Sequence, residues 1–362
     1  MRFWLLKIGY CLIIVSWLLV IPAAALDLNG SYENDTLFGF KRGAVPLAGN
    51  LNRFRLKIHQ QAGEQANLYL EPRYYFFPST SSVALTGASD LDKLVWDKAY
   101  VKVNLPRAAV TVGKQRIAWG SGYIWNPTDV SNPQTLSFAV GEEDETNVEA
   151  VRLEVPLGAL NSLDGYVRTS SEWRSSVKGV RGKVNVGIFD YAVSYADLGD
   201  GDFMIGFDAV GEVFDFGVRN EIAYRSPTGS NVYYQSVWGL DYTLANGLYL
   251  NAEYYNNGLG HASLEDYDWD NRILGRDYLY FGLNKSLDEI TQLGCSVITN
   301  LDDLSYLLYP SFQRSMSDNL DLNIEAMILG GVVGSEYYPP AAQDSFGLGG
   351  SKFGLVRFKY SF

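Results

Sequence analysis

The sequence predicts an all-β protein: a transmembrane antiparallel up-and-down β-barrel of sixteen to eighteen strands, with eighteen as the best count. Beyond residue 25, apolar and polar residues alternate in segments of about ten residues, the pattern of a strand with two different faces. No apolar run there reaches the ~18–20 residues that a spanning helix needs. The chain also ends on an alternating aromatic run of Phe358, Tyr360 and Phe362.

Composition excludes two other classes of protein. The 362 residues are 47% hydrophobic and 14% aromatic, which gives enough apolar surface to offset chain entropy and argues against intrinsic disorder. The net charge is −12, whereas nucleic-acid binding needs a basic surface. We therefore expect a folded protein with no nucleic-acid partner.

Residues 1–25 have the plan of a secretory signal peptide. Arg2 and Lys7 precede an apolar run over 8–21, and Ala23 and Ala25 occupy small-residue cleavage positions. An N-terminal membrane anchor is the alternative, but the small residues directly after the apolar run favour cleavage before residue 26. The barrel is then expected over 26–362, where Cys295 is the one cysteine, so no internal disulfide is possible.

The strand assignments follow the alternation segment by segment. In 52–60, for example, Phe54, Leu56 and Ile58 share one face while arginine, lysine and histidine residues share the other. The same two-faced pattern predicts eighteen strands at 27–40, 49–60, 65–76, 93–104, 107–117, 147–156, 161–170, 176–185, 187–196, 203–211, 213–225, 231–244, 247–257, 276–285, 288–300, 303–313, 317–330 and 350–362.

The connections between these segments alternate in length. Short ones such as 62–64 and 245–247 alternate with long ones at 77–92, 118–146, 258–275 and 331–349, as expected for tight periplasmic turns and long extracellular loops. A soluble β-sandwich or propeller also has many short strands. The strict alternation of loop lengths, the even strand count and the aromatic residues at strand ends favour the membrane barrel over both.

If the apolar faces meet lipid, the opposite faces line the interior, and their charges change sign along the chain. Residues 27–185 carry 18 Lys+Arg and 17 Asp+Glu, whereas 186–330 carry 6 and 22. Facing walls of opposite charge would set up a transverse field that orients polar solutes; alternatively, the charges pair across strands and solvate a filled interior. The predicted basic wall is Arg53, Arg55, Lys57, Arg73, Lys98, Lys102, Arg152, Arg168, Arg181, Lys183, Arg357 and Lys359. The predicted acidic wall is Asp190, Asp208, Asp215, Glu221, Asp241, Glu253, Asp321 and Glu325.

The most distinctive local stretch is 113–129, GKQRIAWGSGYIWNPTD. Its pattern resembles the third-loop region of several large porin-like families of Gram-negative outer membranes, and the terminal Phe362 resembles the closing strand of outer-membrane proteins. The resemblance implies that 118–146 folds inward as a constriction. An alternative, compatible with the first, is that the tryptophans only pin the loop to the wall. The constriction residues implied are Lys114, Arg116, Trp119, Trp125, Asn126 and Asp129.

The sequence offers little for catalysis or for a cofactor. The two histidines, His59 and His261, lie in no phosphate-loop, zinc-site or nucleophile-elbow pattern. The acidic stretches 142–145 and 265–270 suit hard cations but lack EF-hand spacing, so a solvated surface patch, or a bridge to the cation-linked lipopolysaccharide layer, is favoured over a dedicated site. We expect no enzyme activity, no cofactor and no dedicated metal site.

These observations predict a channel of the cell outer membrane for passive diffusion of small polar solutes. The resemblance implies outer-membrane lipid and lipopolysaccharide as surroundings, the barrel-assembly machinery as reader of Phe362, and a possible homotrimer. The alternatives are a plugged or partner-dependent barrel in export or assembly, and a substrate-specific channel. In the latter, Tyr69, Tyr75, Tyr249 and Tyr255 would stack against sugars or aromatic solutes.

Overall fold

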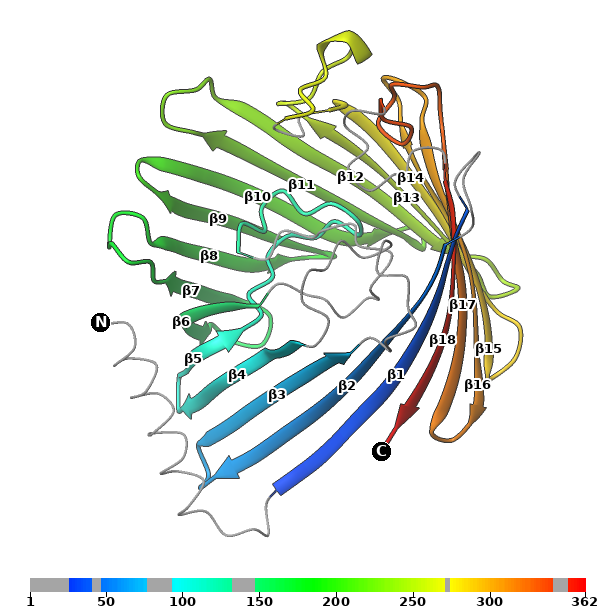
Figure 1. Cartoon of the computed structure of the whole chain (residues 1–362). Helices are drawn as coiled ribbons and strands as arrows, with labels where there is room; N and C mark the ends of the chain where they lie inside the picture. Colours follow the sequence, from blue (N-terminus) through cyan, green and yellow to red (C-terminus); the bar gives the residue numbers. More distant parts are fainter. Residues whose placement is uncertain (1–25, 41–46, 77–92, 132–146, 271–273, 341–350) are drawn as a thin grey trace.

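The computed structural model describes residues 26–40, 47–76, 93–131, 147–270, 274–340 and 351–362. These residues form one closed antiparallel sheet of eighteen strands (Figure 1), which confirms the predicted fold class and strand number. The strands are β1 (Leu26–Phe40), β2 (Leu47–Ala62), β3 (Ala66–Phe76), β4 (Lys93–Leu105), β5 (Ala108–Gln115), β6 (Val148–Pro156), β7 (Ser162–Arg168), β8 (Val177–Val186), β9 (Phe189–Gly199), β10 (Asp202–Val213), β11 (Phe216–Ser226), β12 (Tyr233–Thr243), β13 (Leu248–Asn257), β14 (Asp277–Ser286), β15 (Thr291–Asn300), β16 (Tyr306–Ser317), β17 (Leu320–Gly330) and β18 (Lys352–Ser361).

Each strand pairs with its neighbours in the sequence, and β1 closes the barrel against β18. That last register runs from Ser31 opposite Ser361 to Phe40 opposite Lys352. Beyond it, the backbone N–H of Gly30 donates to the carbonyl oxygen of Phe362 (2.9 Å), and the N–H of Phe362 donates back (3.0 Å). Closure leaves no unpaired edge in this sheet. A β-structure in lipid needs such closure, because its backbone polar groups have no water with which to form hydrogen bonds.

The connections fall into a short-turn end and a long-loop end. At the short-turn end, β2–β3, β4–β5, β8–β9 and β10–β11 are joined by two or three residues. The prediction of strict alternation is wrong at one place, because β9 and β10 are joined at the long-loop end by Asp200 and Gly201 alone. Both have positive φ, 55° and 96°, the backbone that a tight hairpin turn requires. This connection therefore adds no long loop at the ends of β9 and β10.

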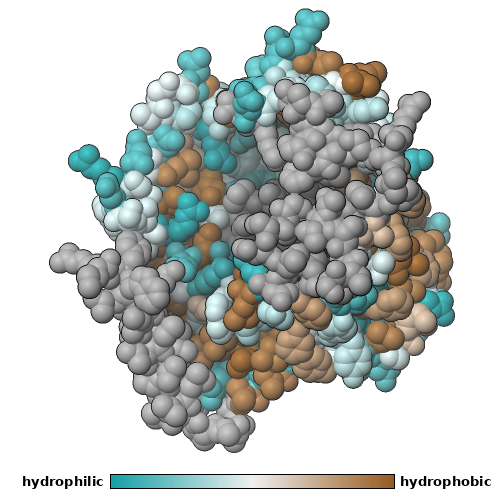
Figure 2. Space-filling view, in the orientation of Figure 1, coloured by the Kyte–Doolittle hydropathy of each residue, from teal (hydrophilic) through white to brown (hydrophobic). Residues whose placement is uncertain are grey.

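The outer surface is largely apolar and aromatic. Figure 2 shows apolar residues gathered on the outside over β1–β3 and over the last strands of the chain. Among its polar groups is an outer amide cluster on β1 and β2, in which Asn50 Nδ2 donates to Asn34 Oδ1 (3.2 Å) and Asn52 Nδ2 to Asn50 Oδ1 (2.8 Å). The cluster is Tyr32, Asn34, Thr36, Asn50 and Asn52.

Helical structure is limited to a 3₁₀ turn, η3 (Leu264–Asp266), within the part of the chain that the structure describes. No helix in that part is long and apolar enough to cross a membrane.

Candidate functional site: the barrel interior

The inner faces of β1 to β4 carry basic and acidic side chains in contact with one another. The Arg53 guanidinium lies 2.9 Å from Glu33 and 2.7 Å from Asp35, and that of Arg73 lies 2.5 Å from Asp97. These groups are almost fully buried: Arg73 is 1% exposed and Asp35 0%. The same pattern joins Arg55 to Glu71 and Asp97, Lys98 to Glu71, Arg357 to Asp35 and Lys359 to Glu33.

Pairing continues around β4 to β12. Arg152 bonds Asp164 through two nitrogens (2.9 and 2.6 Å), and Arg181 bonds Asp208 (2.8 Å). Acids thus lie among the predicted basic residues, and part of the predicted acidic set is itself paired with cations. Acidic and basic side chains are therefore intermixed over the inner surface. Because they pair, the electric field across the barrel is weaker than that of two separate charged walls. The other pairs here are Lys102–Glu154, Lys178–Asp197, Lys183–Asp190 and Arg219–Asp241.

The remaining predicted wall residues differ in their placement. Lys57 lies on β2 and Arg168 ends β7, whereas Asp215 is not on a strand. It lies in the two-residue turn between β10 and β11, where Phe214 and Asp215 have φ of 50° and 67°. The alternation predicted a strand there because Asp215 stands between two phenylalanines, but the reversal of the chain takes that position.

The described part of the loop after β5, residues 116–131, lies against the inner wall (Figure 1). Its first anchor is Trp119, which is 3% exposed. The indole Nε1–H donates to Asp164 Oδ2 (3.0 Å), and the ring meets Tyr166 edge-on at 5.0 Å between centroids. Ile117, Ala150 and Val177 complete this buried cluster, so the start of the loop is fixed to β6, β7 and β8.

Glu221, on β11, is the second anchor. Its Oε2 accepts hydrogen bonds from the backbone N–H groups of Ser121 (2.7 Å) and Gly122 (3.1 Å). Its Oε1 accepts from Thr128, through the backbone N–H (2.7 Å) and the hydroxyl (2.8 Å). Glu221 is 0% exposed, and one buried carboxylate therefore holds both ends of the loop segment 121–128.

Glu253, on β13, is the third anchor and holds the middle of the segment. It accepts from the backbone N–H groups of Tyr123 (2.5 Å), Ile124 (2.9 Å) and Trp125 (2.9 Å). The Trp125 ring stacks on Tyr255, with centroids 5.2 Å apart. Successive N–H groups aimed at one anion form a nest, and such charge-assisted bonds are about twice as strong as neutral ones.

Glycines let the loop approach the wall closely. A Cβ added at Gly206 of β10 would lie 2.6 Å from Thr128 Cγ2, and one at Gly179 of β8 would lie 2.6 Å from the Trp119 ring. In the loop, Gly120 has φ of 94°, and its Cβ would meet Glu221 Oε2 at 2.6 Å. At these three positions, the absence of a side chain lets the loop and the wall approach each other closely.

The predicted constriction residues separate into two groups. Trp119, Trp125, Asn126 and Asp129 belong to the docked loop, with Asp129 6% exposed and bonded to the Ser131 N–H (3.2 Å). Lys114 does not belong to it: it is in β5, next to the inward, buried Gln115, and its ammonium donates to the Trp96 carbonyl (2.5 Å). Arg116 directly follows β5 and is exposed.

The rings of the proposed tyrosine track are largely occupied. Tyr69 is stacked between His59 (4.4 Å) and Tyr100 (4.8 Å). The guanidinium of Arg73 covers Tyr75 at 5.7 Å, and Trp125 covers Tyr255. Tyr249 lies on β13. Three of the four rings therefore already have a neighbour within the described residues, and Tyr69 has one on each side.

At the long-loop end, Glu336 links the connection after β17 to β14, to β15 and to the connection between β15 and β16. Its Oε2 accepts from the Tyr278 hydroxyl and from Asn300 Nδ2, both at 2.8 Å, while its backbone N–H donates to Asp303 (2.8 Å). Burial raises the pKa of Glu336 to about 7. The acidic stretch 265–270 contributes Tyr267, whose hydroxyl also bonds Asp303 (3.0 Å); the stretch 142–145 lies outside the described residues. Within those residues, no group of three or more His, Cys, Asp and Glu could hold a metal ion.

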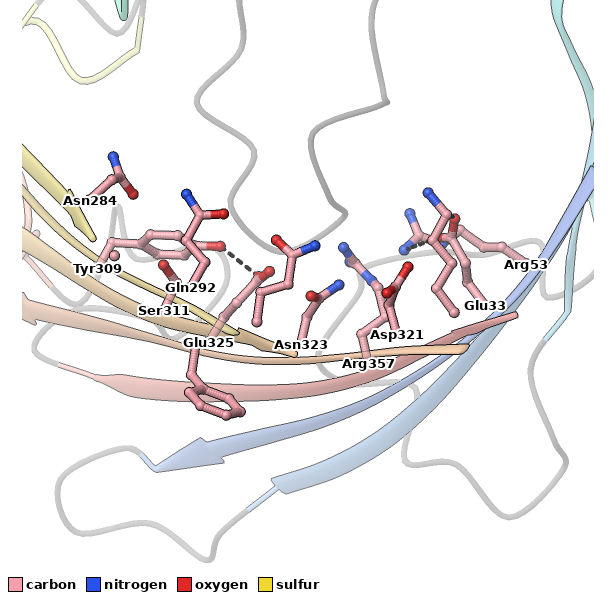
Figure 3. A pocket seen from close by; sticks show the side chains of 14 residues that line it. Glu33, Arg53, Asn284, Gln292, Tyr309, Ser311, Asp321, Asn323, Glu325 and Arg357 are labelled. Carbon is pink, nitrogen blue, oxygen red and sulfur yellow. Dashed lines mark hydrogen bonds and ion pairs between the residues drawn. The ribbon is translucent and has the colours of Figure 1, made fainter. Parts of the chain in front are cut away.

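A cavity of about 250 Å³ opens on the inner wall opposite the first loop anchor (Figure 3). The side chains labelled in Figure 3 rise from β14–β18, β1 and β2 into the interior. The Tyr309 hydroxyl donates to Glu325 (2.5 Å) in its floor. The lining residues are Glu33, Arg53, Asn284, Gln292, Gly294, Tyr309, Ser311, Phe312, Gln313, Asp321, Asn323, Glu325, Arg357 and Lys359. The sequence analysis named the charged members except Glu33, and it missed the amides, which have no local pattern.

The fold is shared with solved outer-membrane porins. OccK11 (OpdR) of Pseudomonas aeruginosa superposes with a TM-score of 0.64 at 10% identity, covering 93% of this chain and 96% of that one. OccAB2 of Acinetobacter baumannii gives a TM-score of 0.62 at 9% identity, covering 93% and 98%. A chain from work on asymmetric conductivity of engineered proteins gives 0.51 at 12%, covering 93% and 100%. No family model and no curated protein matches the sequence.

Proposed function

We propose that this protein is an outer-membrane channel through which small polar solutes diffuse passively. The observation that carries the proposal is a closed eighteen-stranded barrel with a polar, charge-paired interior and an apolar exterior. A closed sheet of this kind satisfies its own backbone in lipid, and a polar interior lets hydrated solutes pass. The shared fold with outer-membrane porins supports the same function and location.

The loop 118–146 acts in this proposal as the constriction. Trp119, Glu221 and Glu253 support that role because they hold its described part against one side of the interior. The pore-lining role of the paired wall residues belongs to the same proposal. The competing function is a plugged or partner-dependent barrel in export or assembly, in which the same loop closes the interior.

Single-channel conductance in a planar bilayer tests the proposal, comparing the refolded mature chain with a variant lacking 118–146. We expect open, weakly selective current in the first and larger current in the second. No current from pure, folded protein would refute the channel. Current from the deletion variant alone would establish the plugged barrel instead.

The remaining assignments follow from this location. Residues 1–25 act as the cleaved export signal, lipid and lipopolysaccharide surround the barrel, and Phe362 presents the closing strand to the assembly machinery. A homotrimer would place part of the apolar exterior between copies, which cross-linking in native membranes tests. We propose no catalytic role: His59 is stacked on Tyr69 and within 3.3 Å of Asn67, and His261 makes backbone contact with Gly275.

A further inference from the structure

We propose that the wall cavity of Figure 3 is a binding site for a neutral polyhydroxylated solute of monosaccharide size, and that it disfavours carboxylates and amines of the same size. The inference rests on the proposed channel function and names the solute class of its interior. Its volume of about 250 Å³ is below the roughly 300–1,000 Å³ of sites for drug-sized ligands. A single ring is therefore the appropriate size.

The cations of the cavity are already neutralised by the wall behind them. Arg357 binds Asp35 through Nε (2.7 Å) and a second nitrogen (3.2 Å). Arg53 binds both Asp35 (2.7 Å) and Glu33 (2.9 Å), and Lys359 lies 3.8 Å from Glu33. A solute carboxylate would have to compete with acids that are buried and fixed.

Two acids of the cavity, Glu325 and Asp321, accept hydrogen bonds from hydroxyl groups. Glu325 accepts from the Tyr309 hydroxyl (2.5 Å), and Asp321 accepts from the Ser315 hydroxyl (2.7 Å). Within the described residues, neither has a cation within 4 Å. Each carboxylate has four lone-pair positions, so further hydroxyl hydrogens can be accepted in the same way.

The charges that line the cavity also balance. Three acids, Glu33, Asp321 and Glu325, and three basic residues line it, so a charged solute meets charges of both signs and loses hydration on entry. This balance distinguishes the cavity from an anion or cation site. A neutral solute pays the smaller desolvation cost.

The rest of the lining consists of groups that both donate and accept. Asn284, Gln292, Gln313, Asn323 and Ser311 belong to this part of the lining. An amide presents two donors and one acceptor oxygen a fixed distance apart, which suits neighbouring hydroxyls of a polyol. The buried amide oxygen of Asn323 has no hydrogen-bond partner within the described residues, so this side chain keeps bonding capacity.

Uptake into liposomes tests the inference with three probes of one size and different charge: glucose, gluconate and glucosamine. The refolded mature chain should take up labelled glucose with a saturable initial rate at least about threefold above that of either charged probe. Gln313→Leu removes one neutral hydrogen-bonding group and should lower the saturable glucose rate roughly threefold to tenfold. Asn104→Leu, at an exposed amide of β4 outside the cavity, should leave it unchanged.

Faster uptake of gluconate or glucosamine, or equal rates for all three, would overturn the solute class. This ranking uses the unmodified chain and does not depend on whether a variant folds; Asn323→Leu provides a second variant if Gln313→Leu fails to fold. An unchanged glucose rate in both folded variants would overturn the site. Ion conductance measured on the same preparation distinguishes failure of the proposed channel function from failure of the proposed solute class. An absence of conductance refutes the channel. Normal conductance with the wrong ranking of uptake rates refutes only the solute class.

Discussion

Replacing Glu221 and Glu253 by glutamine should release the loop inside the barrel. A glutamine at 221 keeps one oxygen and turns an NH₂ group toward N–H donors, so two of the four hydrogen bonds from Ser121, Gly122 and Thr128 are lost. Charge-assisted bonds contribute about 1.5–3 kcal/mol each. The loss of two thus costs at least about 3 kcal/mol, which lowers the ratio of docked to undocked loop roughly a hundredfold.

The assay is single-channel recording of the E221Q, E253Q and double variants beside the unmodified chain. The single variants should show added current noise and a larger mean conductance, and the double variant should approach the loop deletion. Glu212→Gln is the matched control, because Glu212 lies on neighbouring β10, is exposed, and makes no hydrogen bond to the described part of the loop, 116–131. Heat-modified migration on SDS gels establishes that each barrel is folded.

Unchanged conductance and noise in a folded double variant would refute the reasoning. It would mean that Trp119 and the ring contacts of Trp125 hold the loop without the carboxylates. A reduced conductance would also contradict the account, because it would mean that the released loop closes the pore.

Three further predictions concern other parts of the molecule. Gly206→Val should displace Thr128 and speed proteolysis of the loop, whereas Gly182→Ala should not, since a Cβ there meets nothing within 4 Å. Asn50→Ala breaks four hydrogen bonds of the outer amide cluster and should lower the free energy of unfolding from vesicles by about 2 kcal/mol; an unchanged denaturation midpoint would contradict this. Because the pKa of Glu336 is raised from 4.5 to about 7, its contribution to docking the segment 331–340 should be complete below pH 4.5 and lost as pH rises through 7. Hydrogen exchange of that segment should therefore be faster at pH 8 than at pH 5 after correction for the intrinsic rate, and pH-independent in Glu336→Gln.

The sequence predicted the strands well because the period of two is a local property. Phe54 and Arg53 must face opposite ways wherever the strand lies. The same rule could have excluded Lys114 from the constriction, since Gln115 beside it faces inward. Asp215 was misplaced because a turn residue between two phenylalanines looks like a strand.

The contacts of the interior could not be predicted in the same way. Arg53 lies opposite Glu33 in the β1–β2 register, and the sequence does not fix that register across the connection 41–46. The bonds from Glu221 to the loop join residues about one hundred positions apart. Nothing local in the sequence of β11 distinguishes Glu221 from an acid that merely faces water.

The seam between β1 and β18 has a consequence for the order of folding. Every other strand pair joins neighbours in sequence, whereas the bond from Arg357 to Asp35 spans 322 residues. Hairpins can form as the chain emerges, but this pair exists only once the last strand has been delivered, and its closure carries the largest loop entropy in the molecule. Until then, the edge of β1 that pairs with β18 is open, and the carboxylates of Glu33 and Asp35 lack their contacts with Lys359 and Arg357. A chain truncated before Arg357 would consequently form most of its hairpins but would not close into a barrel.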